Sequence, residues 1–269
     1  MADIHGGFQN ADDISDTEVL FNFLDAANAS ESIRSCRRRM LDLCTPKPAN
    51  HFLDIGCGIG HGAFDLACKV GRTGSVVGVD KGEALIAEAK RRAERSPAPP
   101  RYQVGDARRL DLPGNHFDLC RAERVLMYIE TPERAIDEMI RVLRPGGSFA
   151  LFEFDYDCIV VDAADEELTR RIAQLVSDSI PSPRIGRQLP RLLRARGAEA
   201  LTIVPHMIMT PLDTFRRVVG GTVTDAVDKG ELESADVDQW WRELDRSEID
   251  GRLFAGFFGF VICGRSAAA

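Results

Sequence analysis

The sequence lacks long apolar runs and an N-terminal export signal. No uninterrupted apolar run approaches the ~20 residues that a helix needs to span a bilayer. Residues 1–18 are polar and acidic, whereas a signal peptide has a basic segment followed by an apolar one. We therefore expect a cytoplasmic protein with no membrane span.

Cysteine pairs and basic charge are also scarce. The seven cysteines are odd in number and scattered without a C-x-x-C pair, so we predict neither a disulfide framework nor a zinc site. The 34 Lys and Arg residues are outnumbered by 42 Asp and Glu, which gives a net charge of -8 and makes nucleic acid an unexpected partner. The basic clusters are interpreted as solvated faces: Arg37–Arg39, Arg91–Arg92 and Arg108–Arg109.

What remains is the composition of an ordinary globular protein. The chain has 269 residues, of which 44% are hydrophobic and 28% charged. This length predicts roughly two domains, or one large α/β domain with insertions. A homo-oligomer is compatible with the sequence, which leaves the oligomeric state open.

Short β-branched runs alternate with helical stretches in the first part of the chain. We expect strands at 51–55, 75–79, 101–104, 117–120 and 148–154, and helices at 62–70, at 82–95 and from 131. Residues 143–147 (Leu-Arg-Pro-Gly-Gly) are expected to end that last helix and turn into the fifth strand. Strands separated by helices are typical of βαβ crossovers and therefore of a parallel sheet.

The flanking segments complete the expected organisation. Residues 1–14 are expected to form a flexible tail, and residues 15–45 two helices that begin at the capping box Ser15-x-x-Glu18 and serve as a lid. A core at 46–160 follows, and 161–269 hold helices near 164–178 and 187–196, strands near 201–204 and 257–263, and a helical insertion at about 210–255. Pro205 restricts its strand to a sheet edge or a bulge.

A glycine-rich loop follows the first expected strand. Its glycines, which allow a tight turn and close approach of a ligand, are Gly56, Gly58 and Gly60. Asp80 ends the second strand 24 residues after Gly56, close to the spacing at which an acid binds a ribose. Gly105-Asp106-Ala107 follows the third strand, where the Asp106 carboxylate can accept a hydrogen bond from the exocyclic amine of an adenine. Together these residues predict an adenosine site.

The position of the third glycine distinguishes a dinucleotide site from the site of a smaller cofactor. A dinucleotide fingerprint, G-x-G-x-x-G, needs a glycine where His61 stands, whereas Gly56-x-Gly58-x-Gly60 suits a smaller group. Here the sequence resembles the class I S-adenosylmethionine-dependent methyltransferases, and most of all the bacterial small-molecule branch (methyltransferase type 11-like) related to the ubiquinone/menaquinone C-methyltransferases. The resemblance covers about residues 50–155.

The resemblance implies a Rossmann-like three-layer sandwich whose seven-stranded, mostly parallel sheet has an antiparallel last strand and the penultimate strand at an edge. It adds N-terminal helices and a helical cap. S-adenosylmethionine would be the cofactor and S-adenosylhomocysteine the product, with no metal. By this resemblance, the methionine moiety and ribose would contact Gly56, Gly58 and Gly60, with Asp54 nearby, and the ribose hydroxyls would bind Asp80. The adenine would lie beside Lys81, Asp106 and Ala107. The methionine part would also approach the backbone of Arg121.

Two residues are candidates for catalysis on a small-molecule methyl acceptor. The related family often has a His shortly after the fourth strand, and this chain has Met127-Tyr128, so Tyr128 either orients or deprotonates the acceptor or is a core tyrosine. Glu153, with Asp155, follows the fifth strand and either accepts a proton or pairs with a cationic acceptor, or is a surface acid. Together with Asp157 they suggest an oxygen-rich metal site, but alternate carboxylates on an extended segment do not converge.

Other conspicuous side chains have ordinary interpretations beside functional ones. His61, at a helix start, and His206, after the edge strand, are expected to be structural because neither has a recognisable partner. The insertion with Phe215, Trp240 and Trp241 is either a lid over an apolar pocket or plain helix packing.

Three functions remain open. The leading one is methyl transfer to a carbon, oxygen or nitrogen of a small organic acceptor of a secondary-metabolite or quinone-like kind. The others are a cofactor-binding protein with a non-methylating role, such as cyclisation, and a nicotinamide oxidoreductase.

Overall fold

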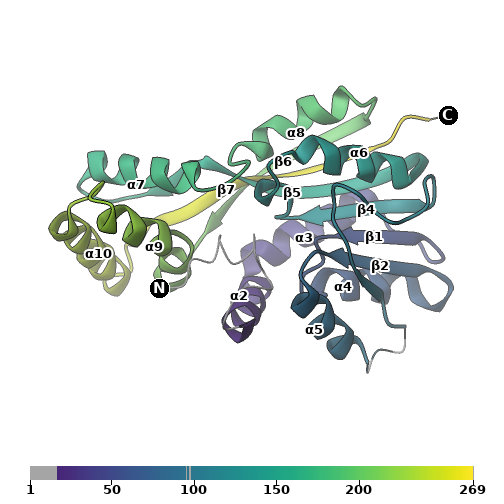
Figure 1. Ribbon diagram of the computed structural model, residues 1–269, viewed down its shortest axis with the longest axis horizontal. Coiled ribbons are helices and arrows are strands. Elements are labelled where there is room, and N and C mark those ends of the chain that lie inside the picture. Colours follow the sequence, from purple (N-terminus) through teal and green to yellow (C-terminus); the bar gives the residue numbers. More distant parts are fainter. Residues whose placement is uncertain (1–16, 95, 97, 269) are drawn as a thin grey trace.

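The computed structural model describes residues 17–94, 96 and 98–268. These residues build a seven-stranded sheet in the order β3-β2-β1-β4-β5-β7-β6 (Figure 1). The strands are β1 His51–Ile55, β2 Ser75–Asp80, β3 Arg101–Val104, β4 Phe117–Glu123, β5 Leu143–Val161, β6 Glu199–Met209 and β7 Ala255–Arg265. Strands β1 to β5 pair in parallel, and β7 lies antiparallel between β5 and β6. The expected fold, with the penultimate strand at an edge, is confirmed.

Helices cover both faces of this sheet (Figure 1). One face carries α3 Glu31–Cys44, α4 His61–Val70 and α5 Glu83–Ala93, and the other carries α6 Pro132–Val142 and α8 Ile185–Arg194. Strand β1 is buried along almost its whole length, which is typical of a parallel strand covered on both sides. Helix α6 has Pro132 in its first turn, and the side chain of Thr131 before it accepts no capping hydrogen bond.

Strand β5 is much longer than the sequence predicted. The expected turn at 143–147 is an irregularity within it, since Phe117 pairs with Leu143 and Leu119 with Ser148. At its other end β5 continues beyond Asp155, because β7 provides a partner as far as Ala255. Strand β6 is longer too, so that His206 lies within the strand and not after it.

The extended ends of β5, β6 and β7 carry a helical lobe, at the left of Figure 1. It contains α7 Glu166–Asp178, α9 Leu212–Asp228 and α10 Ser234–Ile249. Trp240 is 1% exposed, packs on Phe215 and donates a hydrogen bond from Nε1 to Oγ1 of Thr169 at 2.9 Å. Of the two interpretations of these aromatic residues, helix packing is the one that the contacts support.

The described residues begin with helix α2, Thr17–Ala29, which is followed by α3. Ser15 and the expected tail at 1–14 lie outside the described residues. Within the described ranges, none of the helices has the length and apolar character that crossing a membrane requires.

We expect Trp240→Ala to lower the free energy of unfolding by about 3–5 kcal/mol, because the substitution leaves a large cavity between α7, α9 and α10. The adjacent Trp241 is only partly buried and stacks against Arg216, whose Cζ lies 4.2 Å from the ring centroid. Trp241→Ala is therefore the matched control and should cost clearly less. Urea unfolding followed by circular dichroism measures both, and equal losses would contradict this account of the lobe.

Candidate functional site

One cavity of about 890 Å³ opens at the carboxyl ends of β1, β2 and β4, where open α/β sheets bind ligands. Helices α2 and α3 and the base of the lobe complete its wall. The residues singled out from sequence that line it are Gly56, Gly58, Asp80, Lys81, Asp106, Ala107, Arg121 and Tyr128. Asp54, Gly60 and Glu153 do not line it.

The glycine loop has a backbone that other residues would rarely adopt. Gly56, Gly58 and Gly60 have φ values of 66°, 54° and 91°. A Cβ on Gly56 would lie 2.2 Å from Val125 Cγ2, and one on Gly60 would lie 2.5 Å from the Tyr102 hydroxyl. Gly60 therefore serves packing, whereas Gly56 and Gly58 present their backbone to the cavity.

Two aspartates that follow neighbouring strands meet the same cavity. The Asp80 carboxylate accepts hydrogen bonds from the backbone N–H of Gly58 at 2.8 Å and of Gly82 at 3.1 Å, and burial raises its pKa despite them. Asp106 forms an ion pair with Arg108 at 2.7 Å, which lowers the pKa of Asp106. Arg108 lines the cavity, and its side chain is about half exposed, as expected for a solvated face.

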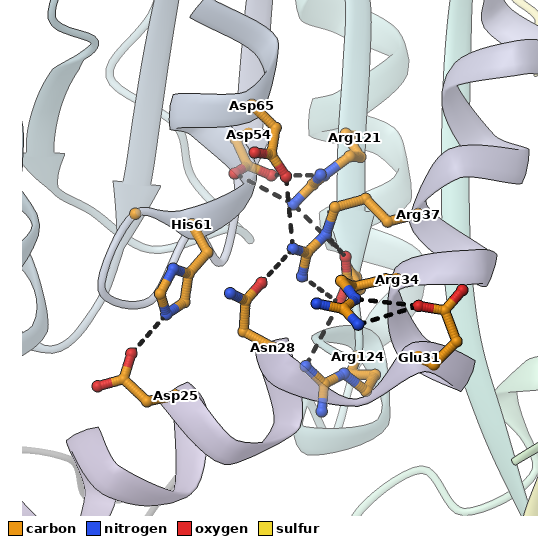
Figure 2. Close-up of polar contacts among 12 residues, drawn as sticks. Asp25, Asn28, Glu31, Arg34, Arg37, Asp54, His61, Asp65, Arg121 and Arg124 are labelled. Atoms are coloured by element: carbon orange, nitrogen blue, oxygen red, sulfur yellow. Dashed lines mark hydrogen bonds and ion pairs between the residues drawn. The ribbon is translucent and has the colours of Figure 1, made fainter. Parts of the chain in front are cut away.

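Arg121 reaches the cavity through its side chain. Its Nε donates to Asp54 Oδ1 at 3.0 Å (Figure 2), and both side chains are almost fully buried. A Cβ on Gly62 would lie 1.6 Å from Arg121 Nη2, so only glycine leaves room for this guanidinium at the start of α4. Nη1 of Arg121 is buried and has no hydrogen-bond partner among the described residues. Asp54 therefore orients Arg121 from beneath the cavity.

A buried carboxylate, Glu123, joins α3 to the end of β4. Arg37 donates to it from Nε at 2.9 Å and from Nη2 at 3.0 Å, and also contacts Asn28 and the half-exposed Asp65 (Figure 2). Burial alone would raise the pKa of Glu123, but Arg37 and Arg121 hold it well below its usual range. The prediction that Arg37 lies on a solvated face is wrong, because this carboxylate draws it inward.

Glu153 supports the loop that follows β4. Its carboxylate accepts hydrogen bonds from the backbone N–H of Val125 at 2.9 Å, Leu126 at 2.8 Å and Met127 at 3.3 Å. It is 0% exposed, and burial raises its pKa to about 7. The carboxylate is buried and does not line the cavity, which contradicts the surface-acid interpretation; its role toward an acceptor stays a prediction.

Tyr128 faces the cavity from this loop. Its hydroxyl and that of Tyr156 on β5 are hydrogen-bonded, and burial raises the pKa of both phenols. A tyrosine with a raised pKa stays protonated at neutral pH. It is therefore suited to donating a hydrogen bond.

A second charged cluster holds α2 against the core. His61 Nε2 lies 2.8 Å from Asp25 Oδ1 (Figure 2). Arg92 donates to both oxygens of Asp25. Burial lowers the pKa of His61. His61 thus does have a partner, one that the sequence did not reveal because it comes from a different helix.

The residues of the far wall of the cavity were not predicted from the sequence. It is apolar and is contributed by the long strands and by α9: Phe154, Ile208, Met209, Val218 and Phe257. Apart from its general apolar character, the sequence carries no signal for this wall, because its residues become neighbours only through the unexpected length of β5, β6 and β7.

The acidic residues of β5 are engaged elsewhere. Asp155 is 1% exposed and pairs with Arg187, and Asp157 accepts hydrogen bonds from Arg184 at 2.5 Å and Ser177 at 2.6 Å. In the part of the chain that the structure describes, no group of three or more His, Cys, Asp or Glu side chains is arranged to hold a metal ion.

The position of Glu153 predicts a pH-dependent stability. Its pKa is about 7 in the folded chain and 4.5 without the fold, so its contribution to stability is complete below pH 4.5 and is lost as the pH rises to about 7. The free energy of unfolding should fall over this range by up to about 3 kcal/mol relative to Glu153→Gln, which cannot ionise. Denaturant unfolding at about pH 5 and about pH 8 measures the difference. Glu167→Gln, at an exposed position, is the control; a pH-independent difference for Glu153→Gln would contradict the prediction.

Comparisons with known proteins agree with this geometry. The model of a methyltransferase domain family matches residues 53–151. An uncharacterized protein in a transposon of Streptomyces fradiae is 36% identical over 185 residues, which are 68% of this chain and 53% of that protein. The chain spans about half the length of several curated relatives that it matches, the Streptomyces protein among them.

One solved structure and one relative define the likeness further. The YcgJ protein from Bacillus subtilis superimposes with a TM-score of 0.63 at 17% identity, over 88% of this chain and all of that one, which shows the shared fold. The 2-phytyl-1,4-naphtoquinone methyltransferase of Trichormus variabilis is 31% identical over 175 residues, 59% of this chain and 76% of that enzyme. With this coverage and a matching domain model, the chain belongs to the family of S-adenosylmethionine-dependent methyltransferases.

Proposed function

We propose that this chain transfers the methyl group of S-adenosylmethionine to a small, largely apolar organic acceptor. The observation that carries this proposal is that the glycine loop, Asp80 and the Asp106–Ala107 pair, which come from three separate strand ends, line one cavity. Its volume of about 890 Å³ lies within the range of roughly 300–1,000 Å³ typical of small-molecule sites and leaves room for an acceptor beside the cofactor.

The adenosine half of the cofactor fits the residues after β2 and β3. An ionised carboxylate offers about four acceptor sites, and Asp80 uses two of its hydrogen bonds on backbone N–H groups, which leaves capacity for ribose hydroxyls. Lys81, Asp106 and Ala107 line the same cavity, and we assign them to the adenine. The ion pair with Arg108 would fix the orientation of the Asp106 carboxylate.

The methionine half fits the loop and the end of β4. Gly56 and Gly58 permit close approach to the backbone, and the unpartnered Nη1 of Arg121 suits a carboxylate. Asp54 and Gly62 hold this guanidinium in place. The side chain of Arg121 thereby adds to the backbone contact that the sequence predicted.

When bound, the cofactor supplies a methyl group on a good leaving group. The protein then has to align an acceptor and exclude water. Phe23, Leu24 and Ala27 of α2 close the cavity over the glycine loop, and the Asp25 cluster keeps that helix in position. The apolar far wall favours acceptors with a largely apolar body, in keeping with the quinone substrate that the Trichormus enzyme's name specifies.

The first test is calorimetric titration with S-adenosylhomocysteine, beside NADH under the same conditions. We expect micromolar binding of S-adenosylhomocysteine alone. Binding of NADH alone would overturn the proposal. Acceptor screening by mass spectrometry then separates methyl transfer, which adds a methyl group to the acceptor, from a cyclisation that conserves its mass.

Asp80→Ala tests the ribose contact. We expect the affinity for S-adenosylhomocysteine to fall about tenfold or more, because hydrogen bonds to a charged group are lost, while the circular dichroism spectrum stays that of the folded chain. Asp111→Ala removes an exposed aspartate that does not line the cavity and is the control. Equal affinities of Asp80→Ala and the unmodified chain would reject the assignment of Asp80.

A further inference from the structure

Arg124 presents a hydrogen-bond donor that the preceding proposal does not use. It directly follows β4, lines the cavity and has a left-handed backbone with φ 58°. Its Nη2 donates to Glu123 Oε1 at 3.3 Å, and Figure 2 shows its side chain near that of Arg37. Its Nε is buried and has no hydrogen-bond partner within the described part of the chain. Buried donors without partners are rare and call for an explanation such as a ligand.

The charges around Arg124 do not balance. Three guanidinium groups, those of Arg37, Arg121 and Arg124, surround Glu123 at 2.9, 3.6 and 3.3 Å. The second buried carboxylate, Asp54, is engaged by Arg121. Two buried carboxylates therefore face three cations.

The remaining nearby acids do not remove this excess. Asp65 contacts Arg37 from a half-exposed position at 3.5 Å. The Glu153 carboxylate is occupied by three backbone N–H groups. An uncompensated buried cation is costly, and an anion in the cavity beside Arg124 would relieve that cost.

The side chains around Arg124 indicate which kind of molecule bears the negative charge. Its positive charge acts on the phenols of Tyr128 and Tyr156, which lie toward the apolar far wall with Phe154 and Phe257. Arg121, by contrast, lies at the glycine loop beside Gly62. Arg124 therefore stands on the acceptor side of the site, where an oxyanion on a mainly apolar molecule would meet a cation and phenolic donors together.

The cavity offers little in the way of a free base. Among the described residues that line it, Glu31, Asp80, Asp106 and Glu123 all accept hydrogen bonds from guanidinium or backbone N–H groups. His61 is paired with Asp25, and Glu130 is solvent-exposed. An acceptor that arrives already ionised needs no such base, whereas attack by a ring carbon would leave a proton for one to remove.

We propose that Arg124 binds the acceptor through an ionised hydroxyl group, and that the acceptor is an apolar phenol or enol methylated on this oxygen. The inference rests on the proposed methyl transfer and names its substrate class. The oxyanion uses a lone pair to form the bond to the methyl carbon, the carbon–sulfur bond breaks, and its electron pair stays on sulfur. The hydroxyl proton leaves to solvent beforehand, so the transfer itself moves no proton.

The test compares two probes that differ only in the ionisable group. The folded chain is saturated with S-adenosylhomocysteine and titrated with 4-nitrophenol, at a pH where it is ionised, and with its methyl ether 4-nitroanisole. We expect Arg124→Gly to weaken binding of 4-nitrophenolate about tenfold or more, because a charge-assisted hydrogen bond is lost, and to leave 4-nitroanisole unchanged. Glycine adopts φ 58° without strain, so this variant keeps the turn.

Two further variants sharpen the result. Arg124→Lys keeps the positive charge and should restore part of the binding. Arg170→Leu removes a 75% exposed arginine of α7 that does not line the cavity, and it should bind both probes like the unmodified chain. Equal weakening of both probes in Arg124→Gly, or no weakening, would overturn the inference.

The cofactor's own carboxylate is the competing source of the anion. If Arg124→Gly weakens S-adenosylhomocysteine but not 5′-methylthioadenosine, which lacks the amino-acid part, Arg124 serves the cofactor; the inference then fails while the proposed methyl transfer stands. If the unmodified chain does not bind S-adenosylhomocysteine, the proposed function fails first.

Discussion

The site depends on one buried carboxylate, that of Glu123 at the end of β4. It receives Arg37 from α3 and two further guanidinium groups from its own strand and the turn that follows. Removing one partner of such a buried pair costs about 3–5 kcal/mol, because the other charge stays behind without compensation. The position of α3, and with it the N-terminal wall of the cavity, is therefore coupled electrostatically to the central strands of the sheet.

A second buried carboxylate, that of Glu153, holds the turn that follows β4. Glu153 fixes the backbone of residues 125–127, and Val125 from this turn packs so closely on Gly56 that no Cβ fits there. The position of the glycine loop is therefore linked, through Val125, to the Glu153 carboxylate. A residue that touches no ligand can in this way set the shape of the cavity.

Local patterns were sufficient to predict much of the fold. β-branched runs marked the strands, and the need for positive φ marked Gly56 and its neighbours, because both depend on the chain close by. Partners distant in sequence were not predictable: Arg37 reads as surface charge until Glu123, 86 residues away, draws it inward. The ends of β5 depended likewise on pairing with β7. The roles of Asp80 and Tyr128 stay predictions, since position in a cavity does not identify a ligand.

The length of β5 has a consequence for how such a site changes over time. Its first half lies in the sheet that positions the glycine loop and Asp80, and its second half supports the lobe that supplies the far wall. Substitutions in α9 or at the distal ends of β6 and β7 can therefore remodel the proposed acceptor side of the cavity while the glycine loop and Asp80 keep their geometry. Acceptor preference and cofactor binding can in this way diverge independently, although a single continuous strand carries both.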